Sequence, residues 1–250
     1  MRFNQYMRES VRDDHGPIRA CLERSVELDP NYANAWASLA NMYVDEDRFG
    51  FNPRPDALDR ALKAAQPAVQ LAPESQTAYD QLAFTYFYRG ELDAFLAAAE
   101  RTIQLNPNNT FALADMGLHL AYVGHWERGI ALTKKALAFD PRPPGWYYNA
   151  QFFDAYRRND YEAALAIAQR MNQPDYVWAL ASRAAAYGQL GRKEEAQPDV
   201  KRIRELDPDF EVTARQRRWK FFRFQKPLLD QFMDGLRKAG LNIPEQKPDE

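Results

Sequence analysis

Five prolines of this chain close the same short phrase, in which an apolar residue and one further residue precede the proline. The phrase ends at Pro30, Pro73, Pro107, Pro141 and Pro208. The steps from the second to the third and from the third to the fourth of these prolines are both 34 residues. Because proline ends a helix, the period marks units of one length that each finish where a helix finishes. Such a chain is predicted to fold as an array of repeats in which every unit packs against its neighbours.

Each unit is predicted to contain two helices, since apolar residues return between the prolines at steps of three and four. In the unit that starts at Gln76, Gly90 supplies the turn between the helices, and the second helix runs to Leu105. The next unit places Gly117 and Gly129 on paired helices, where a side chain at either position would hold the helices apart. Strand patterns are absent from the sequence, so the predicted fold is all-α.

The period fails first after Tyr43, where nine residues are added. The segment 45–55 contains two prolines and a glycine and is predicted to be a loop. We expect its rings, Phe49 and Phe51, to tuck back onto the array, with an exposed contact as the alternative.

The period fails again between Pro141 and Pro208, which are one residue short of two full steps apart. The missing residue predicts a bent or tightened fifth unit, with its turn at Asn159. Trp146 and Trp178 lie on either side of it, so a specific binding site is expected there.

The unit near residue 33 carries Trp36, Leu39, Ala40 and Tyr43 at the spacing of a known motif. These residues resemble the tetratricopeptide repeat, which has a large residue, a leucine, a small residue and an aromatic residue at places four, seven, eight and eleven. The resemblance covers about residues 15–210. It implies a helix-turn-helix solenoid, a right-handed superhelix whose concave groove binds partners and holds no reaction centre.

The predicted organisation is a repeat array over residues 1–208, capping helices over 209–241 and a disordered tail over 242–250. The array has about six units, of which the first is degenerate and begins with a helix in residues 2–12. Capping helices are expected because the last apolar face of a solenoid otherwise meets water.

The first capping helix contains a basic and aromatic run from Arg215 to Phe224. Val212, Arg215, Trp219 and Phe222 follow helical spacing, which predicts that Trp219 and Phe222 are buried on the last repeat. Two alternatives stay open: a partner protein binds this helix, or segment 215–226 binds nucleic acid or an anionic membrane surface.

A narrower resemblance is carried by residues 171–174, 184–191 and 236–241, which read MNQP, AAAYGQLG and LRKAGL. They resemble the carboxyl-terminal repeat region of bacterial class III adenylate/guanylate cyclases and related winged-helix regulators. The resemblance implies a regulatory or docking segment of a bacterial signalling or transcriptional protein, and it transfers no catalytic residue. The alternative is a non-catalytic fragment of a nucleotidyl cyclase.

Reactive side chains are sparse. The chain has three histidines, His15, His119 and His125, and no cysteine or paired carboxylate completes a metal ligand set with them. Asp115 lies four residues before His119 and is expected to form a satisfied polar pair with it. We therefore predict no catalytic residue, no metal site, no cofactor and no enzymatic activity.

Charge and hydropathy restrict the partners and the compartment. The net charge is −2, which argues against a general polyanion binder, and the single cysteine cannot form an internal disulfide. Neither a secretory signal nor an apolar run of membrane-spanning length is visible. The sequence predicts a cytoplasmic protein for which nucleic acid and membrane are not the expected partners.

The concave surface of a tetratricopeptide array is lined by its first helices at places two, five, nine and twelve. We predict an aromatic, amide-flanked groove there that binds an apolar peptide or helix, supplied by a partner protein or by missing domains of the same protein. An alternative is that these rings pack in the core; in that case the double variant Phe84→Ala with Trp146→Ala is expected to unfold instead of losing only a ligand. The candidate binding residues are Asn41, Asp80, Phe84, Phe87, Phe111, Leu118, Trp146, Asn149, Phe153, Tyr156 and Trp178.

Overall fold

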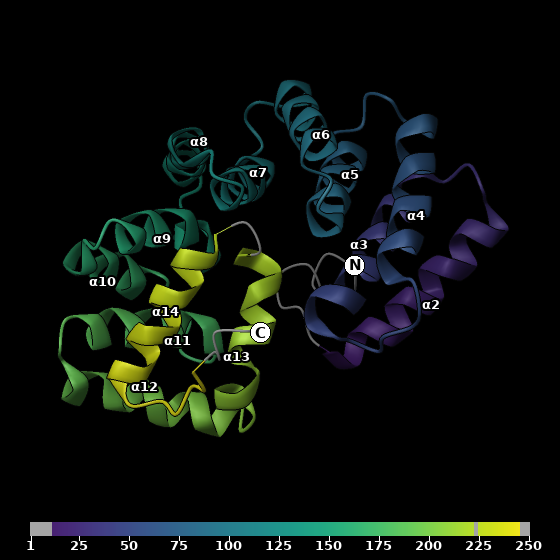
Figure 1. Ribbon diagram of the computed structural model, residues 1–250. Helices are drawn as coiled ribbons and strands as arrows, with labels where there is room; N and C mark the ends of the chain where they lie inside the picture. Colours follow the sequence, from purple (N-terminus) through teal and green to yellow (C-terminus); the bar gives the residue numbers. More distant parts are fainter. Residues whose placement is uncertain (1–11, 223–224, 246–250) are drawn as a thin grey trace. The chain divides into compact units, whose positions relative to one another are not determined.

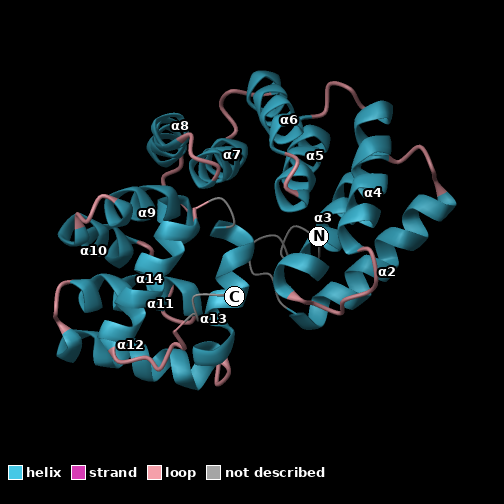
Figure 2. Ribbon diagram, viewed as in Figure 1, coloured by secondary structure: helices cyan, strands magenta, loops and turns pink. Residues whose placement is uncertain are grey.

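The computed structural model describes residues 12–222 and 225–245, and within them every regular element is a helix (Figures 1 and 2). The prediction of an all-α fold is confirmed. In chain order the helices are α2 (Arg12–Leu28), α3 (Ala33–Phe49), α4 (Ala57–Leu71), α5 (Gln76–Arg89), α6 (Leu92–Leu105), α7 (Thr110–Tyr122), α8 (Trp126–Phe139), the 3-10 helix η1 (Gly145–Tyr148), α9 (Asn149–Arg157), α10 (Tyr161–Arg170), α11 (Val177–Gln189), α12 (Lys193–Leu206), α13 (Phe210–Phe222) and α14 (Lys226–Ala239).

The chain forms two compact units, Met1–Ala112 and Leu113–Glu250. In the first unit α3 packs with α4 and α5 packs with α6, and in the second unit α9 packs with α10 and α11 packs with α12. Consecutive helices therefore pair as the 34-residue period predicts. The predicted helix in residues 2–12 and most of the tail at 242–250 lie outside the described residues.

Local signals set the helix ends. The hydroxyl of Ser75 accepts a hydrogen bond from the backbone N–H of Ala78 at 3.3 Å, which caps the start of α5. Helix α5 ends at Gly90, whose φ of 80° is the left-handed conformation that glycine adopts without strain. The predicted turn at this glycine is confirmed.

The pair of glycines in α7 and α8 permits close contact between these helices. A Cβ atom built on Gly117 lies 2.7 Å from the carbonyl oxygen of Gly129, and one built on Gly129 overlaps the carbonyl oxygen of Gly117. Both distances are too short for a real side chain, so the prediction that a side chain there would separate the helices is confirmed.

The loop formed by the insertion after Tyr43 is shorter than predicted. Helix α3 continues to Phe49 and ends at Gly50 with a φ of 67°, so the prediction of a loop over residues 45–49 is wrong. The physical reason is that no helix-breaking residue precedes Gly50, and that Glu46 is buried in an ion-pair network described below. The rings of Phe49 and Phe51 stack with centroids 5.0 Å apart and are half-buried, which confirms that they tuck back.

The fifth unit is tightened as predicted. It opens with the 3-10 helix η1, its two α-helices α9 and α10 are short, and Asn159 takes the turn with a φ of 62°. A Cβ atom on Gly145 would overlap the carbonyl oxygen of Met171, so the start of this unit lies against the end of its own second helix.

Helices α13 and α14 lie where the two capping helices were predicted, but the predicted buried face of α13 is wrong. Val212 is 72% exposed and Trp219 is 41% exposed, whereas Phe210, Ala214 and Arg218 are buried. The reason is that the ring of Phe210 packs on Trp178 of α11. Ala214 and Arg218, four and eight positions after Phe210, then lie on the same face of the helix. The side chain of Phe222, which was predicted to be buried with Trp219, lies outside the described residues.

Candidate functional site

Most of the predicted groove residues are buried. Eight of the eleven are buried and three are half-buried, so the predicted rings do not form an open surface. The buried ones are Asn41, Asp80, Phe84, Phe87, Leu118, Phe153, Tyr156 and Trp178, and the half-buried ones are Phe111, Trp146 and Asn149.

In the first unit the predicted rings pack against other residues of the same unit. Phe84 meets Tyr88 edge-on with ring centroids 4.9 Å apart, and Phe87 meets Phe95 at 5.6 Å. The guanidinium carbon of Arg48 lies 5.4 Å from the centre of the Phe84 ring. These contacts place Phe84 and Phe87 in the core.

The predicted polar residues of the first unit are also buried. Asp80 accepts a hydrogen bond from the side-chain amide of Gln81 at 3.0 Å, and Asn41 on α3 is 3% exposed. The alternative in which the groove positions pack internally therefore describes this unit.

In the second unit the same positions are covered by another part of the chain. Helix α14 packs against α11 and also contacts α9 (Figure 1). The ring of Phe232 on α14 lies 5.5 Å from Phe153 and 5.8 Å from Tyr156, measured between ring centroids. Two residues predicted to bind a partner helix thus contact the chain's own last helix.

Side-chain amides fix the position of α14 on this surface. Gln189 of α11 donates its amide to the carbonyl oxygen of Gln231 at 3.0 Å, and the amide of Gln231 donates to the carbonyl oxygen of Tyr156 at 2.9 Å. The Tyr156 hydroxyl lies 3.2 Å from the same Gln231 carbonyl and donates to it. Burial raises the pKa of Tyr156, so this hydroxyl stays protonated and remains a donor.

Two glycines allow the backbones of α11 and α14 to touch. A Cβ atom on Gly188 would overlap the carbonyl oxygen of Gly235, and one on Gly235 would overlap the Tyr156 hydroxyl and lie 2.7 Å from the carbonyl oxygen of Ala185. Seating of α14 therefore depends on the absence of a side chain at both positions.

Besides the amide hydrogen bonds and the glycine pair, this surface contains a buried arginine among aromatic rings. The guanidinium carbon of Arg218 on α13 lies 4.8 Å from the ring centre of Trp178, 4.9 Å from that of Phe153 and 5.8 Å from that of Phe232. Arg218 is 4% exposed. We call Phe153, Trp178 and Phe232 the aromatic cage. Two of its three walls are predicted groove residues.

The remaining predicted residues are not part of the cage. Leu118 lies on α7 and Asn149 begins α9, while the Trp146 ring in η1 packs edge-on against Tyr147 at 4.5 Å. Phe111 belongs to the first unit.

Sequence reasoning missed the residues that complete the site: Gly188, Gln189, Arg218, Gln231, Phe232 and Gly235. One available signal was Gly188, which follows the alanines at 184–186 by two positions, together with Gly235 in the last helix. The same small-residue argument had identified Gly117 and Gly129.

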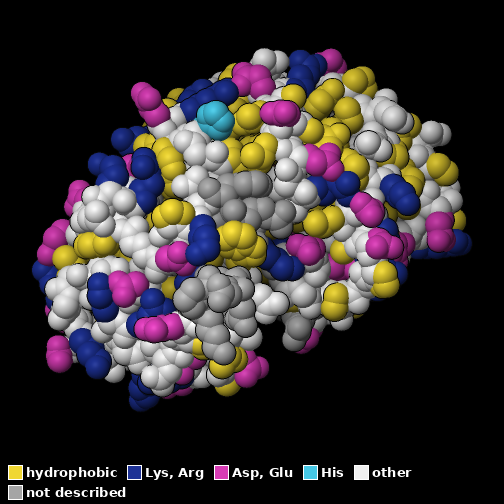
Figure 3. Space-filling model, viewed as in Figure 1, with side chains coloured by type: hydrophobic (Ala, Val, Ile, Leu, Met, Phe, Trp, Pro, Cys, Tyr) yellow, Lys and Arg dark blue, Asp and Glu magenta, His cyan; other side chains and the backbone are white. Residues whose placement is uncertain are grey.

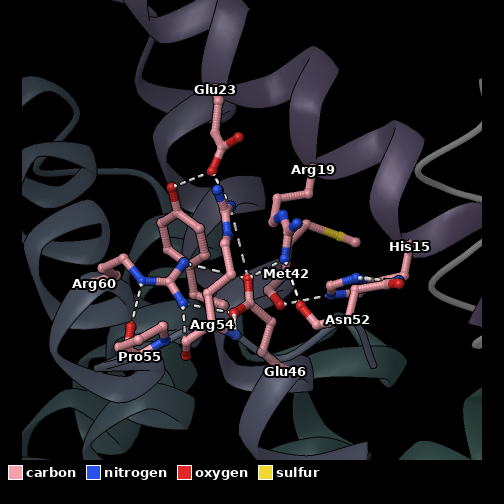
Figure 4. A network of polar contacts seen from close by, with 10 residues as sticks. His15, Arg19, Glu23, Met42, Glu46, Asn52, Arg54, Pro55 and Arg60 are labelled. Atoms are coloured by element: carbon pink, nitrogen blue, oxygen red, sulfur yellow. Dashed lines mark hydrogen bonds and ion pairs between the residues drawn. The ribbon is translucent and has the colours of Figure 1, made fainter. Parts of the chain in front are cut away.

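A second cluster of polar groups lies in the first unit, around Glu46 (Figure 4). Its buried carboxylate pairs with Arg19 at 2.6 Å and with Arg60 at 2.5 Å, and it accepts a hydrogen bond from the backbone N–H of Arg54 at 3.0 Å. The Arg54 side chain in turn pairs with Glu23. Helices α2, α3 and α4 and the end of the inserted loop thus meet at one carboxylate.

The protonation states of this network follow from its contacts. Burial by itself disfavours the charged carboxylate, but the hydrogen bonds from Arg60, Arg19 and Arg54 outweigh it and lower the pKa of Glu46. Burial and the nearby Glu23 raise the pKa of Tyr43 to about 12. Every charge in the network has a partner, so we assign it the structural role of fastening the inserted loop.

Other candidates for chemistry are accounted for by local contacts. The Nδ1 atom of His119 lies 2.8 Å from the carbonyl oxygen and 3.4 Å from the carboxylate of Asp115, which confirms the predicted polar pair. Within residues 12–222 and 225–245, no three His, Cys, Asp or Glu side chains are grouped to hold a metal ion. None of the described helices has the length and apolar character that crossing a membrane requires.

The basic residues of α13 and the start of α14 have partners of their own. Arg215 and Lys226 pair with Asp230 at 2.7 and 3.2 Å, and Arg217 pairs with Asp207. Figure 3 shows Lys and Arg side chains interspersed with Asp and Glu side chains on the face that it draws.

No protein-family model matches the sequence, and the comparison with curated proteins finds no match. Solved structures do match. The Cut9–Hcn1 hetero-tetramer of the APC/C has a TM-score of 0.66 at 14% identity, with 95% of this chain and 44% of that chain covered. A tetratricopeptide repeat protein from Parabacteroides merdae has a TM-score of 0.57 at 16% identity, with 96% and 91% covered.

A human IFIT1 dimer with m7Gppp-AAAA has a TM-score of 0.65 at 20% identity, with 90% of this chain and 54% of that chain covered. This chain thus spans about half the length of two of these neighbours. The likeness shows the fold: the chain is a helical solenoid of the tetratricopeptide repeat type.

Proposed function

We propose that this helical repeat protein is a protein-interaction scaffold whose concave surface in the second unit, formed by α9 and α11, binds an amphipathic helix. The observation that carries the proposal is that α14 lies on the concave positions of these helices and is held there by ring contacts and amide hydrogen bonds. The surface therefore has the chemistry that recognises a helix, and α14 is its occupant within the chain.

The contact has the two components of helix-in-groove recognition. Helix α14 buries one apolar face, which provides most of the free energy of docking. Gln189 and Gln231 add hydrogen bonds that fix its register. The buried residues of that face are Leu228, Leu229, Phe232, Met233, Leu236 and Ala239.

The biological setting follows from the sequence resemblance described above. We place the scaffold in the regulatory or docking part of a bacterial signalling or transcriptional protein, with the partner helix supplied by another protein or by a further domain of the same protein. Tetratricopeptide-like neighbours such as the Cut9–Hcn1 assembly support a scaffold role, because their fold presents surfaces for other chains.

Nucleic-acid binding is the weaker alternative. One neighbour is the human IFIT1 dimer with m7Gppp-AAAA. In the present chain Arg215 and Arg217 already pair with carboxylates, and Arg218 is buried. These contacts favour a protein partner.

The test uses the full chain and a labelled synthetic peptide with the sequence of residues 226–241. In the wild-type chain α14 is tethered and competes with the peptide at an effective concentration on the order of millimolar, so weak binding is expected. Gly235→Ala places a methyl group against Tyr156 and Ala185 while improving the helix propensity of α14. We expect this variant to bind the peptide at least about tenfold more tightly than the wild type, as measured by fluorescence anisotropy.

Gly16→Ala is the matched control, because a Cβ atom there makes only an ordinary contact of 3.5 Å with Asn52. It is expected to bind as weakly as the wild type. Hydrogen exchange reports whether α14 is released in Gly235→Ala. Released α14 without gain in peptide binding would show that the surface is not a helix receptor.

A further inference from the structure

Resting on the proposed function, we infer that the aromatic cage of Phe153, Trp178 and Phe232, which is complete only while α14 lies on the helix-binding surface, is a second pocket that recognises an arginine. It selects a partner helix that presents an arginine. Arg218 of α13 fills this pocket within the chain and so competes with the partner's arginine.

The geometry of the cage suits a guanidinium group. All three ring centres lie within 6 Å of the Arg218 guanidinium carbon, the range in which a cation is attracted by the ring quadrupole. Two rings come from the two concave helices, Phe153 from α9 and Trp178 from α11, and the third is presented by α14. A planar guanidinium can lie against several ring faces at once.

Burial makes the pocket selective between arginine and lysine. Arg218 is 4% exposed, so any cation that enters must lose most of its water. A guanidinium is more weakly hydrated than an ammonium group and therefore loses less on entering.

The packing of α13 indicates which partner can replace it. The helix packs through one face, made of Phe210, Ala214 and Arg218, while Val212 and Trp219 on the other side are exposed. A partner helix can reproduce this face with three residues spaced four positions apart. They are an aromatic residue, a small residue and an arginine, in that order. We expect such a helix to compete with α13 for the pocket.

Chemical rescue of Arg218→Ala in the full chain tests the pocket. The substitution removes the part of the arginine side chain beyond Cβ, which has the atoms of an ethylguanidinium ion. Ethylguanidinium is therefore the probe, and propylammonium is the control cation, because it carries the same charge on an ammonium group. We expect ethylguanidinium to raise the melting temperature of Arg218→Ala relative to wild type in the same solution, and to bind at least about tenfold more tightly than propylammonium. Equal effects of the two cations on the variant, or none, would overturn the inference.

Arg218→Lys keeps the charge and provides a second readout. A guanidinium-selective cage predicts a lower melting temperature for Arg218→Lys than for the wild type, whereas a site that needs only positive charge predicts no change. A labelled peptide of residues 208–222 is then added to Arg218→Ala, in parallel with the same peptide carrying Arg218→Lys. Preference for the arginine peptide supports the cage, and equal binding refutes it.

The outcomes are separable from those of the α14 peptide experiment. Rescue by ethylguanidinium with no binding of the 226–241 peptide would leave the pocket in place and reject the helix receptor. Binding of the 226–241 peptide without selectivity between the two cations would support the helix receptor and reject the pocket.

Discussion

Gly188 and Gly235 face each other where α11 crosses α14, and a Cβ atom at Gly188 would overlap the carbonyl oxygen of Gly235 and lie 2.7 Å from the backbone nitrogen of Ala239. The obstructing atoms belong to the backbone, so they cannot move aside as the end of a flexible side chain can. The last helix therefore reaches the concave surface only because both positions lack a side chain.

Gly188→Ala is accordingly expected to destabilise the protein, although alanine favours a helix over glycine by about 1 kcal/mol. Overpacking costs about 1–3 kcal/mol and should exceed that gain. Urea unfolding followed by circular dichroism measures the change. Gly16→Ala serves as the control and should be neutral or stabilising, because α2 has room for a Cβ atom there. A stability of Gly188→Ala equal to that of the control would mean that α14 is not seated as described.

Much of the fold was predictable because it depends on local signals. The 34-residue period located the helix pairs, and Gly90 and Asn159 take the positive φ angles that their turns require. The end of α3 was not predictable in the same way. Asp45 and Glu46 are polar residues typical of a loop, and the burial of Glu46 depends on Arg19 of α2 and Arg60 of α4, which sequence spacing does not reveal.

The candidate site was predictable only in part. The tetratricopeptide resemblance implied that Phe153, Tyr156 and Trp178 are concave residues, but it gives no information on what covers them. The partner within the chain, Phe232, lies 54 residues after Trp178 and 76 after Tyr156. The phase of α13 was set by Phe210 instead of Trp219. Long-range contacts of this kind need the tertiary structure.

Glu46→Gln tests the polar network of the first unit. The change removes the negative charge that Arg19 and Arg60 share and leaves these guanidinium groups partly buried. Breaking a buried ion pair from one side costs about 3–5 kcal/mol, and the partial exposure of the arginines places the expected loss toward the lower end of that range. Asp59→Asn is the control, since the exposed pair of Asp59 with Arg89 should contribute less than about 1 kcal/mol. Similar losses for both variants would contradict the structural role of Glu46.

The same carboxylate predicts a dependence of stability on pH. The pKa of Glu46 is lower in the folded protein than its usual value of 4.5, so the folded state holds this proton less tightly than the unfolded state does. The contribution of ionised Glu46 to the free energy of unfolding is therefore complete above its pKa in the unfolded chain. It is lost as the pH falls through the lower pKa of Glu46 in the folded protein. The stability difference between wild type and Glu46→Gln should narrow over that acid range, as measured by urea unfolding at successive pH values. A difference that stays constant down to the lowest accessible pH would argue against ionisation of Glu46.

Phe84→Ala separates a core residue from a groove residue. Phe84 is 4% exposed and packs on Tyr88, so its truncation is expected to cost about 3–5 kcal/mol. Trp146 is half-buried and should tolerate truncation better. Thermal unfolding of the two single variants makes the comparison. Wild-type stability in Phe84→Ala would restore the interpretation that this ring faces an open groove.

Trp219→Ala and Phe210→Ala test the orientation of α13. Phe210 is fully buried against Trp178, so removing its ring should cost about 3–5 kcal/mol. Trp219 is 41% exposed on the other face, and its removal should change the free energy of unfolding by about 0.5 kcal/mol or less. Urea unfolding gives both values, and tryptophan fluorescence should lose its solvent-exposed component in Trp219→Ala. If the larger loss belongs to Trp219, α13 is rotated relative to the structure, and Arg218 then does not enter the aromatic cage.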